Sequence, residues 1–476
     1  MFTALPLFNT VALHRLARLA VLTCLYAAPA GAQQRPDSTA PATARALLDG
    51  YVAEALAANL ALAQQHAALR RADAAVREAS GRFLPSVALN ARYSEFTGVV
   101  NIGDFINPAY AALNQLTGQT RFPTDVSATL PFRQETRLEL TVPLFNDALF
   151  GAQAAARAQR DLVGSGRRGA MRQLAGDVQR AWIGYATAVR AVEILEQTLP
   201  VLDEHVRVSE RLIANGQATP DVLLRVRADR SELLQQLAET KRQRDAARRG
   251  FNLLRNAPDD APVTLVADST LLTITLTITR DVSTREALVA LAVERREELA
   301  QTGSLIALAG AQERVANAAF LPNVALAASY GVQGDRYRFD RANDVGLASL
   351  VFGWNLFNGT QDAARREQAR ATRNEAEYRR REAERAVRQE VANAWDGVEA
   401  ARVALTAAND RLQAAERAFA LVQRRYAEGL APQIEFLSAR VAHTTAALSA
   451  VVSRYTVAAR LIDLERVAAL RTLPDR

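Results

Sequence analysis

Two stretches of the chain alternate apolar and polar residues, and long helical sequence lies on both sides of each. The later stretch begins at Phe320-Leu321-Pro322 and returns through about 345–357. Every second position is apolar, a spacing typical of a strand with one apolar face. On the first run these residues are Val324, Leu326, Ala328, Tyr330 and Val332. Each run is about ten residues long, enough for a tilted strand to cross the hydrocarbon of a bilayer. The pattern therefore predicts a hairpin of membrane-length strands, at about 321–333 and 345–357.

The same hairpin is predicted earlier in the chain, with strands at about 83–94 and 136–145. Phe83-Leu84-Pro85 matches Phe320-Leu321-Pro322, and Leu144-Phe145-Asn146 matches Leu356-Phe357-Asn358. The two borders lie further apart in the first copy, and the extra length belongs to its loop, Glu95 to Gln134. That long loop contains Asn107-Pro108, Gly118 and Pro123. The chain is therefore expected to be internally duplicated.

Four strands in a membrane leave two unpaired edges. Within lipid every backbone N–H and C=O group must be paired, so an open four-stranded sheet is excluded there. Several chains must then pool their strands, and a homotrimer would supply about twelve, an even number within the range of outer-membrane barrels. Long loops of such barrels face outward, so both hairpin tips are expected outside and the helices on the periplasmic side.

The helical sequence carries a coiled-coil pattern. Apolar residues recur at alternating steps of three and four, as a heptad seam requires. In the second copy they are Val391, Ala394, Val398, Ala401, Leu405, Ala408, Leu412, Ala415, Phe419, Val422 and Tyr426, and the equivalent positions of the first copy, from Val178 to Ile213, are apolar except Ser209. A further seam from Leu437 to Ile462 predicts that the last helix returns antiparallel to this one. Long helices are therefore expected at about 147–215 and 359–428, with a kink at Pro200 in the first.

The chain divides into segments on these patterns. Residues 1–32 resemble a secretory signal peptide, with a basic start, an apolar core and Ala30-Gly31-Ala32 as the cleavage site. Residues 33–257 form the first repeat, with a helix-hairpin tip at about 214–221. Residues 284–476 form the second, with its tip at about 427–435. Between them, 258–283 breaks the helical pattern, and its alternating run 272–279 predicts a strand in a small mixed collar.

Composition narrows the chemistry. The formal charge of +7 is spread through mixed Arg and Glu sequence, which favours solvated helix faces over a nucleic-acid surface. Cys24, the only cysteine, lies in the apolar core of the signal peptide. Lipoprotein processing there is the less favoured alternative, because Thr23 is not the small residue usually found before the modified cysteine. The mature chain then has no thiol for disulfides or for a thiolate metal site, and no cofactor is expected.

No catalytic arrangement is recognisable. His66, His205 and His443 are isolated on helical stretches and are interpreted as surface or packing residues. Ser, Asp and Glu are plentiful, but none lies in a nucleophile elbow, a P-loop or a metal-binding spacing. The sequence therefore does not predict an enzyme.

The two bends are the most informative polar places. They read Asn215-Gly216-Gln217-Ala218-Thr219-Pro220-Asp221 and Tyr426-Ala427-Glu428-Gly429-Leu430-Ala431-Pro432-Gln433-Ile434-Glu435. Gly after one helix and Pro at the start of the next is ordinary helix-turn-helix punctuation. Their position at the tips of two repeated coiled coils also allows a functional interpretation, as a docking surface or a constriction.

Taken together, the signal peptide, the duplicated order of helix, strand pair and helix hairpin, the Phe-Leu-Pro and Leu-Phe-Asn strand borders and the Gly-containing tips resemble the TolC-like outer-membrane efflux proteins. The resemblance covers essentially the whole mature chain. It implies a mainly α fold with transmembrane β structure: long antiparallel coiled coils forming a periplasmic α-barrel, and four strands contributed to a trimeric, 12-stranded outer-membrane β-barrel. The implied location is the outer membrane, with helices extending into the periplasm.

The resemblance also implies partners and site residues. The channel would be the passive exit duct of a tripartite efflux or type I secretion system, docking on a periplasmic adaptor and an inner-membrane RND, ABC or MFS pump. Family members carry a Tyr before the second-tip Gly and acidic residues after it, which implies a periplasmic gate at Tyr426 and Glu435, with Asp221 in the first tip. Ala431 stands where the family has a basic residue, and Ser438 replaces the second acidic one.

Two further groups of residues complete the expected sites. The adaptor-docking tips are Asn215, Gly216, Gln217, Glu428, Gly429 and Leu430. The membrane-interface aromatics, at the lipid of the outer membrane, are Tyr93, Tyr330, Trp354, Phe145 and Phe357. The alternative from another class is an exported periplasmic coiled-coil structural or adaptor protein, whose strand pairs would form a small soluble β domain.

Overall fold

The structure is a computed structural model. It describes residues 44–95, 97, 100–127, 129–130, 132–267, 284–334, 343–428 and 430–474. The predicted signal peptide at 1–32, the predicted strand at 272–279 and the tip residue Gly429 lie outside the described residues.

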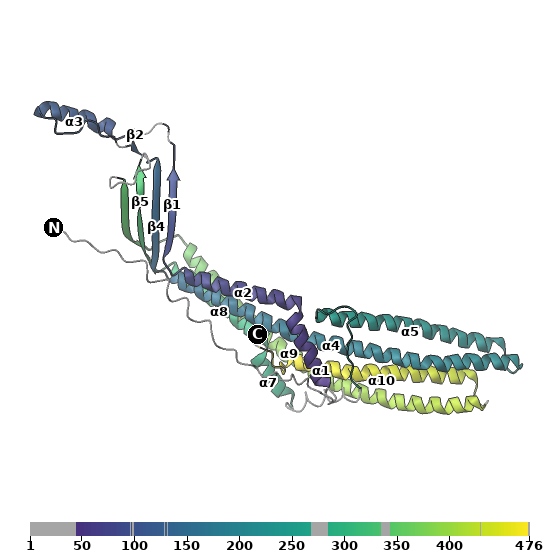
Figure 1. The fold of residues 1–476 in the computed structure, drawn as a ribbon. Coiled ribbons are helices and arrows are strands. Elements are labelled where there is room, and N and C mark those ends of the chain that lie inside the picture. The colour runs from purple at the N-terminus through teal and green to yellow at the C-terminus, as the bar shows by residue number, and fades with distance from the viewer. Residues whose placement is uncertain are drawn as a thin grey trace, which may run out of the picture. The chain divides into compact units, whose positions relative to one another are not determined.

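The described elements follow one order twice (Figure 1). The first half contains α1 (Ala44–Ala58), α2 (Leu60–Gly81), β1 (Ser86–Tyr93), β2 (Val100–Asn101), α3 (Gly103–Thr117), β3 (Thr129–Leu130), β4 (Gln134–Phe145), α4 (Asp147–Ala214) and α5 (Pro220–Leu254). The second half contains α7 (Arg285–Arg295), α8 (Glu297–Ala318), β5 (Asn323–Gly334), β6 (Asp344–Gly353), α9 (Gln361–Ala427) and α10 (Gln433–Val467). The predicted duplication therefore appears as a repeated order of helix pair, strand pair and helix hairpin.

The four long strands form one antiparallel sheet in the order β1-β4-β5-β6. The two predicted hairpins pair with each other through β4 and β5, whose register runs from Gln134 opposite Gly334 to Phe145 opposite Val324. Strands β1 and β6 are the two edges of this sheet. The last strand ends at Gly353, earlier than the predicted 357, so Trp354 and Phe357 lie just beyond it.

The long helices pack as the heptad seam predicts. Helix α9 packs against α10 and α4 against α5, and α10 also contacts α4. Between Ala401 and Tyr426 every seam residue is buried or half-buried, and all residues outside the seam are exposed. In the first copy Ser209, the one polar seam residue, is fully buried and donates its hydroxyl to the His205 carbonyl at 2.9 Å. Helix α4 is assigned as one helix with Pro200 inside it, close to the predicted span of about 147–215.

The long loop predicted between the first two strands contains a helix that was not predicted from the sequence. Residues 103–117 form helix α3, which carries Pro108 internally and ends at Gly118 with a φ of 58°. Asn-Pro and Gly are turn signals, but Pro108 removes one intrahelical hydrogen bond near the start, and the Ala- and Leu-rich sequence that follows favours a helix. A short pair of strands, β2 and β3, closes the base of this insert.

The helical segment before the first strand is broken at Asn59, and its counterpart in the second copy is broken at the equivalent position, Arg296. Both residues have extended backbones, and both donate to the last carbonyl of a returning helix. Asn59 Nδ2 donates to the Leu254 carbonyl of α5 at 3.0 Å, and Arg296 Nη1 donates to the Val467 carbonyl of α10 at 3.0 Å. At each break a side chain therefore donates to the last carbonyl of a helix, which has no hydrogen-bond partner within that helix.

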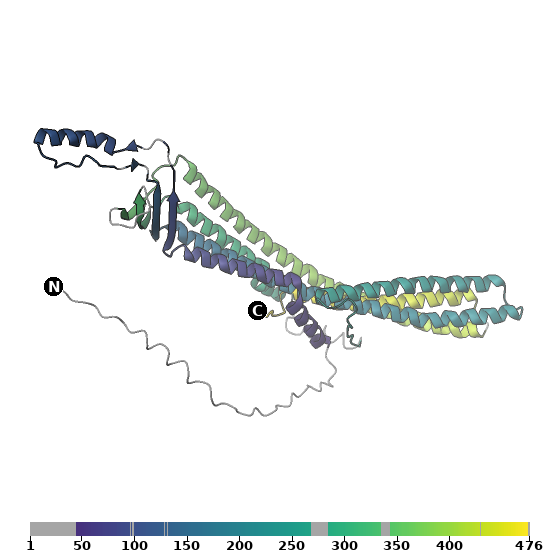
Figure 2. The same ribbon diagram turned by 45° about the horizontal axis from the view of Figure 1, so that its top comes forward.

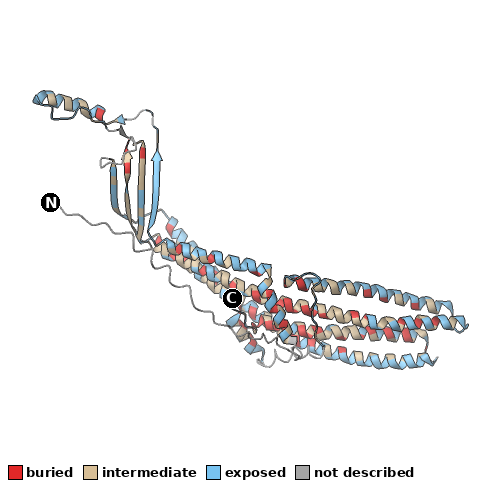
Figure 3. Cartoon of the chain, in the orientation of Figure 1, coloured by how far each residue is buried: buried red, intermediate tan, exposed pale blue. Residues whose placement is uncertain are grey.

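The main core lies where these breaks meet the long helices. It contains Trp182, Phe251, Val391 and Leu461, all fully buried, and Trp182 Nε1 donates to the Thr264 carbonyl at 3.0 Å. Figure 3 shows buried residues gathered here, whereas the edge strands β1 and β6 are mostly exposed and the central strands β4 and β5 mostly half-buried. Among the described helices, no single one is long and apolar enough to cross a membrane. One bent pair, α1 with α2, passes by length and composition and is bent by 52° at its break.

Candidate functional site

The sheet has one apolar and one mostly polar face. The register places Leu89, Leu138 and Tyr330 side by side on one face, followed by the row Val87, Leu140 and Ala328. These side chains are not covered: Leu89 is 70% exposed, Leu350 67% and Phe352 63%. An apolar face of this size is typical of a surface that contacts lipid or protein.

The opposite face carries a ladder of charges. Arg92 donates to Glu135 at 2.7 Å, and Arg137 lies 2.6 Å from the other Glu135 oxygen and donates to Gln333 at 2.6 Å. Asn90 donates to Glu139 at 2.8 Å on the same face. On β6 the pattern weakens, because Leu347 and Val351 share this face. The ladder was not recognised in the sequence, although alternation of Arg137 and Glu139 with leucines was its signal.

The predicted interface aromatics lie at the two ends of the strands. Tyr93 and Tyr330 are exposed toward one end, and Tyr330 donates to Asp344 at 3.1 Å. Phe145, Trp354 and Phe357 are exposed at the other end, where Trp354 Nε1 donates to the Phe320 carbonyl at 3.1 Å.

The distance between the two levels of aromatic side chains is close to the thickness of the apolar part of a membrane. Phe145 lies at the opposite end of β4 from Gln134, the register partner of Tyr93. That spacing is about 36 Å along the strand, or about 28 Å along the membrane normal at a tilt of about 40°. Apolar bands of outer-membrane barrels are about 25 Å tall and have aromatic girdles at both edges.

Each helix tip is closed by backbone hydrogen bonds of the same kind. In the first tip Gly216 has a φ of 69°, Gln217 N donates to the Leu212 carbonyl at 2.8 Å and Gly216 N to the Ile213 carbonyl at 2.9 Å. In the second tip Leu430 N donates to the Arg425 carbonyl at 2.7 Å. These bonds satisfy the last carbonyls of α4 and α9, as the helix-punctuation interpretation requires. Asn215 and Glu428 are the C-cap residues, and Pro220 is the first residue of α5.

The predicted gate residues are not all in contact. Glu435 accepts a hydrogen bond from Arg425 at 3.3 Å, and Arg425 also donates to the Leu430 carbonyl at 3.3 Å. Arg425 therefore supplies a cation beside Glu435 although Ala431 cannot. Tyr426 is half-buried and stacks on Phe436 at 5.0 Å. Asp221 is exposed in the first turn of α5.

Gln433, His205 and Arg440 join the two hairpins near their tips, a role that the sequence did not predict for them. Gln433 Nε2 donates to the Val222 carbonyl at 3.0 Å, next to Asp221, and lies 3.4 Å from His205 Nε2. Arg440, a buried residue of α10, lies 3.6 Å from Asp229 of α5. These contacts join the two repeats, which are far apart in the chain, so no local sequence signal could identify them.

His205 is the most unusual titratable group of this region. It is buried, and its ring lies 4.8 Å from Phe436 and 5.2 Å from Tyr426. Burial lowers the pKa of His205, and the nearby Arg440 lowers it further, whereas Asp229 opposes the shift. The three predicted non-ligand histidines differ in environment: His66 is exposed, and His443 stacks on Phe419 at 5.5 Å.

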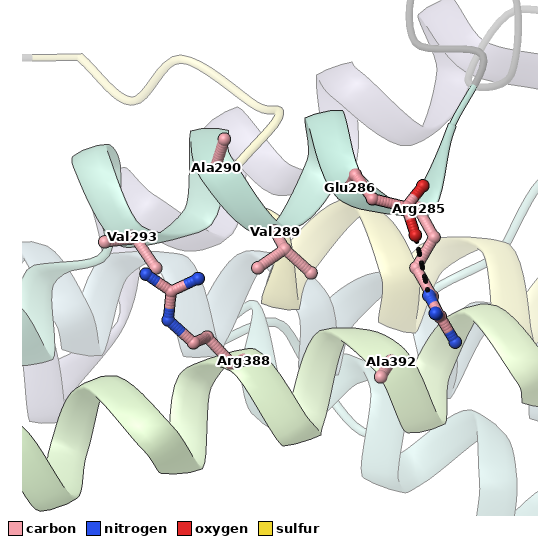
Figure 4. A pocket seen from close by; sticks show the side chains of 7 residues that line it. All are labelled: Arg285, Glu286, Val289, Ala290, Val293, Arg388 and Ala392. Atoms are coloured by element: carbon pink, nitrogen blue, oxygen red, sulfur yellow. Dashed lines mark hydrogen bonds and ion pairs between the residues drawn. The ribbon is translucent and has the colours of Figure 1, made fainter.

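Cavities lie among the described helices. One of about 640 Å³ lies near the tips, between Pro200, His205 and Leu212 of α4 and Tyr426 and Phe436 of the second hairpin. Another, of about 600 Å³, lies between α7 and α9 (Figure 4). Val289 and Val293 line its α7 side, and Arg388 its α9 side. Across the described ranges, no group of three or more His, Cys, Asp or Glu side chains could hold a metal ion.

Comparison with known proteins shows which proteins this chain resembles. Residues 288–469, within the predicted second repeat, match the family described as outer membrane efflux protein. This match covers the second half of the chain, which is similar in sequence to the outer membrane efflux protein family. The TolC-like resemblance is thereby confirmed. Among curated protein sequences, none matches this chain.

Several solved structures share the fold over nearly the whole chain. The CmeC outer membrane channel of Campylobacter jejuni is similar with a TM-score of 0.72 and 15% identity, covering 88% of this chain and 85% of that one. The outer membrane protein VceC of Vibrio cholerae has a TM-score of 0.71 and 19% identity, covering 88% and 95%. The open state of the MtrE outer membrane channel of Neisseria gonorrhoeae has a TM-score of 0.68 and 19% identity, covering 89% and 88%.

Proposed function

We propose that this protein is the outer-membrane exit duct of a tripartite efflux or type I secretion system. The observation that carries the proposal is the sheet with one exposed apolar face, one charged face and two open edges, joined to long helix hairpins. Three copies would pair the β1 edge of one with the β6 edge of the next and close a barrel of about twelve strands. The apolar face then meets outer-membrane lipid, and the ladder of Arg92, Glu135, Arg137 and Glu139 lines the water-filled interior.

The helices serve as the periplasmic part of the same duct. The α4–α5 and α9–α10 hairpins of three copies would enclose an α-helical tunnel, with the two tips at its far end. The family is one of channel proteins rather than of enzymes, so the energy for transport comes from a partner. We propose that the partner assembly is a periplasmic adaptor with an inner-membrane RND, ABC or MFS pump.

The tips are proposed to be both docking surface and gate. Asn215, Gly216 and Gln217 in one tip, and Glu428, Gly429 and Leu430 in the other, would contact the adaptor. Glu435, Tyr426 and Asp221 would narrow the mouth. The exposure of Leu430, at 65%, supports a protein contact there, since a large apolar side chain at a helix tip is left in contact with water.

The test is to measure the mass of the detergent-extracted protein and to record its conductance in a planar bilayer. A trimer that inserts and conducts ions supports the duct. A monomer that stays in solution without detergent and carries no current would contradict it, and would favour an exported coiled-coil adaptor with a soluble β domain.

A further inference from the structure

Helix α3 and the segment that follows it form a braced insert at the end of the sheet, residues 100–130, here called the finger. Asn107 holds both backbone groups of Val126: its Nδ2 donates to the carbonyl at 2.8 Å, and its Oδ1 accepts from the N–H at 2.9 Å. Asn114 binds Phe122 in the same two-way manner, at 2.7 and 3.0 Å. Tyr110 stacks on the Phe122 ring at 5.5 Å. The finger therefore has an internal structure of its own.

The side of α3 that faces away from this bracing is apolar. Phe105 is 75% exposed, Leu116 84% and Leu113 40%, and Ala109 and Ala112 between them are also exposed. Positions 105, 109, 112 and 116 lie on one side of a helix, so these residues form a continuous stripe. The only charged residue of α3 is Asp104, whereas Arg121 and Asp125 lie on the return segment. The finger therefore has an apolar side and a polar side.

The finger begins where the membrane-length strands end. Ser94 N donates to the Arg133 carbonyl at 2.7 Å, which extends the pairing of β1 with β4 past Tyr93, and β2 pairs with β3 just beyond. Figures 1 and 2 show α3 running sideways from the strand ends rather than continuing along them. The stripe thus lies close to the level of the Tyr93 aromatic girdle.

We propose that α3 lies on the outer surface of the outer membrane, in the plane of the interface, with its stripe against the lipid. This inference rests on the proposed function, since it takes the apolar sheet face to be in the same membrane. Helices that lie in an interface have one apolar side at the boundary of headgroups and acyl chains and one polar side in water. Without basic residues on α3, the contact comes from apolar burial and does not need anionic lipid.

Lipid fits the stripe better than a second copy of this chain does. Tyr93, at the end of β1, and Val100, at the start of the finger, are also exposed, at 66% and 57%, so exposed apolar side chains occur on both sides of the junction between the sheet and the finger. Flanking charges fix the register of many helix pairs, and α3 has only Asp104 to serve in that way. A contact with a second copy is a distinct outcome of the experiment below.

The experiment uses single cysteines in the full chain, since Cys24 is the only natural cysteine and belongs to the predicted signal peptide. Leu116→Cys reports on the stripe, Thr120→Cys on the exposed return segment and Leu89→Cys on the sheet face. Each variant is labelled with an environment-sensitive fluorophore and reconstituted in neutral phosphatidylcholine vesicles that contain a nitroxide-labelled lipid. All three positions are exposed, so folding should be unaffected, and the oligomeric mass verifies it.

We expect quenching by the labelled lipid to be at least about threefold stronger at 116 than at 120, and unchanged by salt. Quenching at 89 without quenching at 116 would overturn the helix proposal and leave the channel intact. Absence of quenching at both 89 and 116 would contradict the proposed channel function as well as the helix proposal. If 116 is shielded from aqueous iodide but not reached by the lipid quencher, the stripe contacts protein, which also overturns the proposal.

Discussion

Buried polar residues have different roles at the two ends of the helices. Near the breaks at Asn59 and Arg296, the half-buried Arg172 binds the buried Glu297 with two bonds of 2.7 and 2.8 Å, and the buried Arg296 binds Glu298 with two bonds of 2.8 Å. Bidentate pairs of this kind are geometrically specific and fix how helices meet. At the tips, His205 and Arg440 are buried with fewer partners, so the joint between the two hairpins is the more easily changed of the two regions.

The buried His205 predicts that the helix tips lose stability in acid. Because burial and Arg440 lower the pKa of His205, the unfolded state binds the proton more readily than the folded state does. Stability is then intact above the ordinary His pKa of about 6.5 and declines as the pH falls through the lower folded pKa. We expect the thermal unfolding midpoint to fall between pH 7.5 and 5, and this fall to shrink in His205→Gln.

The matched control for that change is His66→Gln, because His66 is exposed on α2. Other groups near His205 are Arg440 of α10, Asp229 of α5 and Tyr426 of α9. An acid-induced fall that is the same in wild type and His205→Gln would show that another group is responsible.

The seam of α9 allows a packing prediction with an internal control. Val398 is 2% exposed on the seam, and Val403, on the same helix, is 71% exposed. Val398→Ala removes two buried methyl-sized groups and should lower the free energy of unfolding by about 1.5 kcal/mol or more, because a cavity adds to the lost transfer energy. Val403→Ala should cost less than about 0.5 kcal/mol. Guanidinium unfolding followed by helical circular dichroism measures both, and equal effects would contradict the seam.

Among the elements, the sheet depends on close approach of β4 and β5. A Cβ atom added at Gly331 would lie 2.0 Å from the Thr136 carbonyl oxygen of β4, so the strands would have to separate. At Gly346 of β6 an added Cβ would meet only the Tyr330 ring at 3.5 Å, an ordinary contact. The two glycines are in neighbouring strands and therefore form a matched pair.

We expect Gly331→Ala to destabilise the sheet by about 2 kcal/mol or more and Gly346→Ala to have little effect. The yield of heat-resistant oligomer extracted from the membrane fraction measures the difference. Wild-type yield from Gly331→Ala would indicate that β4 and β5 do not pair in the assembled protein as they do here.

At the scale of the whole molecule, the tips of three copies would bring their charges to one axis. Glu435 is paired with Arg425 at 3.3 Å, so each second tip contributes a nearly neutral pair rather than a free carboxylate. Glu435→Gln leaves Arg425 unopposed and makes the mouth more positive. The ratio of cation to anion permeability of the channel should then fall by about twofold or more, since a ring of charge raises or lowers the local concentration of permeant ions.

Reversal potentials under a salt gradient measure this preference in a planar bilayer. The control is Glu375→Gln, which removes an equivalent exposed pair with Arg379 elsewhere on α9. Cation preference that survives Glu435→Gln unchanged would place the selective constriction elsewhere in the duct.

Much of the architecture was predictable from sequence because it follows from local periodic patterns of apolar residues. Strand alternation, the heptad seams and the Gly and Pro residues at the bends each depend on close neighbours in the chain, and the repetition of each pattern in the second half reinforced them. The helix α3 was missed because its Asn and Pro residues are turn signals, while the contacts that brace it, from Asn107 to Val126 and from Asn114 to Phe122, lie outside the helix itself.

By itself the sequence determined the duplicated order of elements, the apolar side of each strand and the seam of each hairpin. It did so because side-chain direction follows directly from the period of a strand or a helix. Only the tertiary structure decided that Arg425 pairs with Glu435, and that Gln433 and Arg440 join hairpins of different repeats. It also decided that Asn59 and Arg296 donate hydrogen bonds to the last carbonyls of α5 and α10. Those contacts depend on which helices lie side by side, and that is set by the packing of the whole chain rather than by any local pattern.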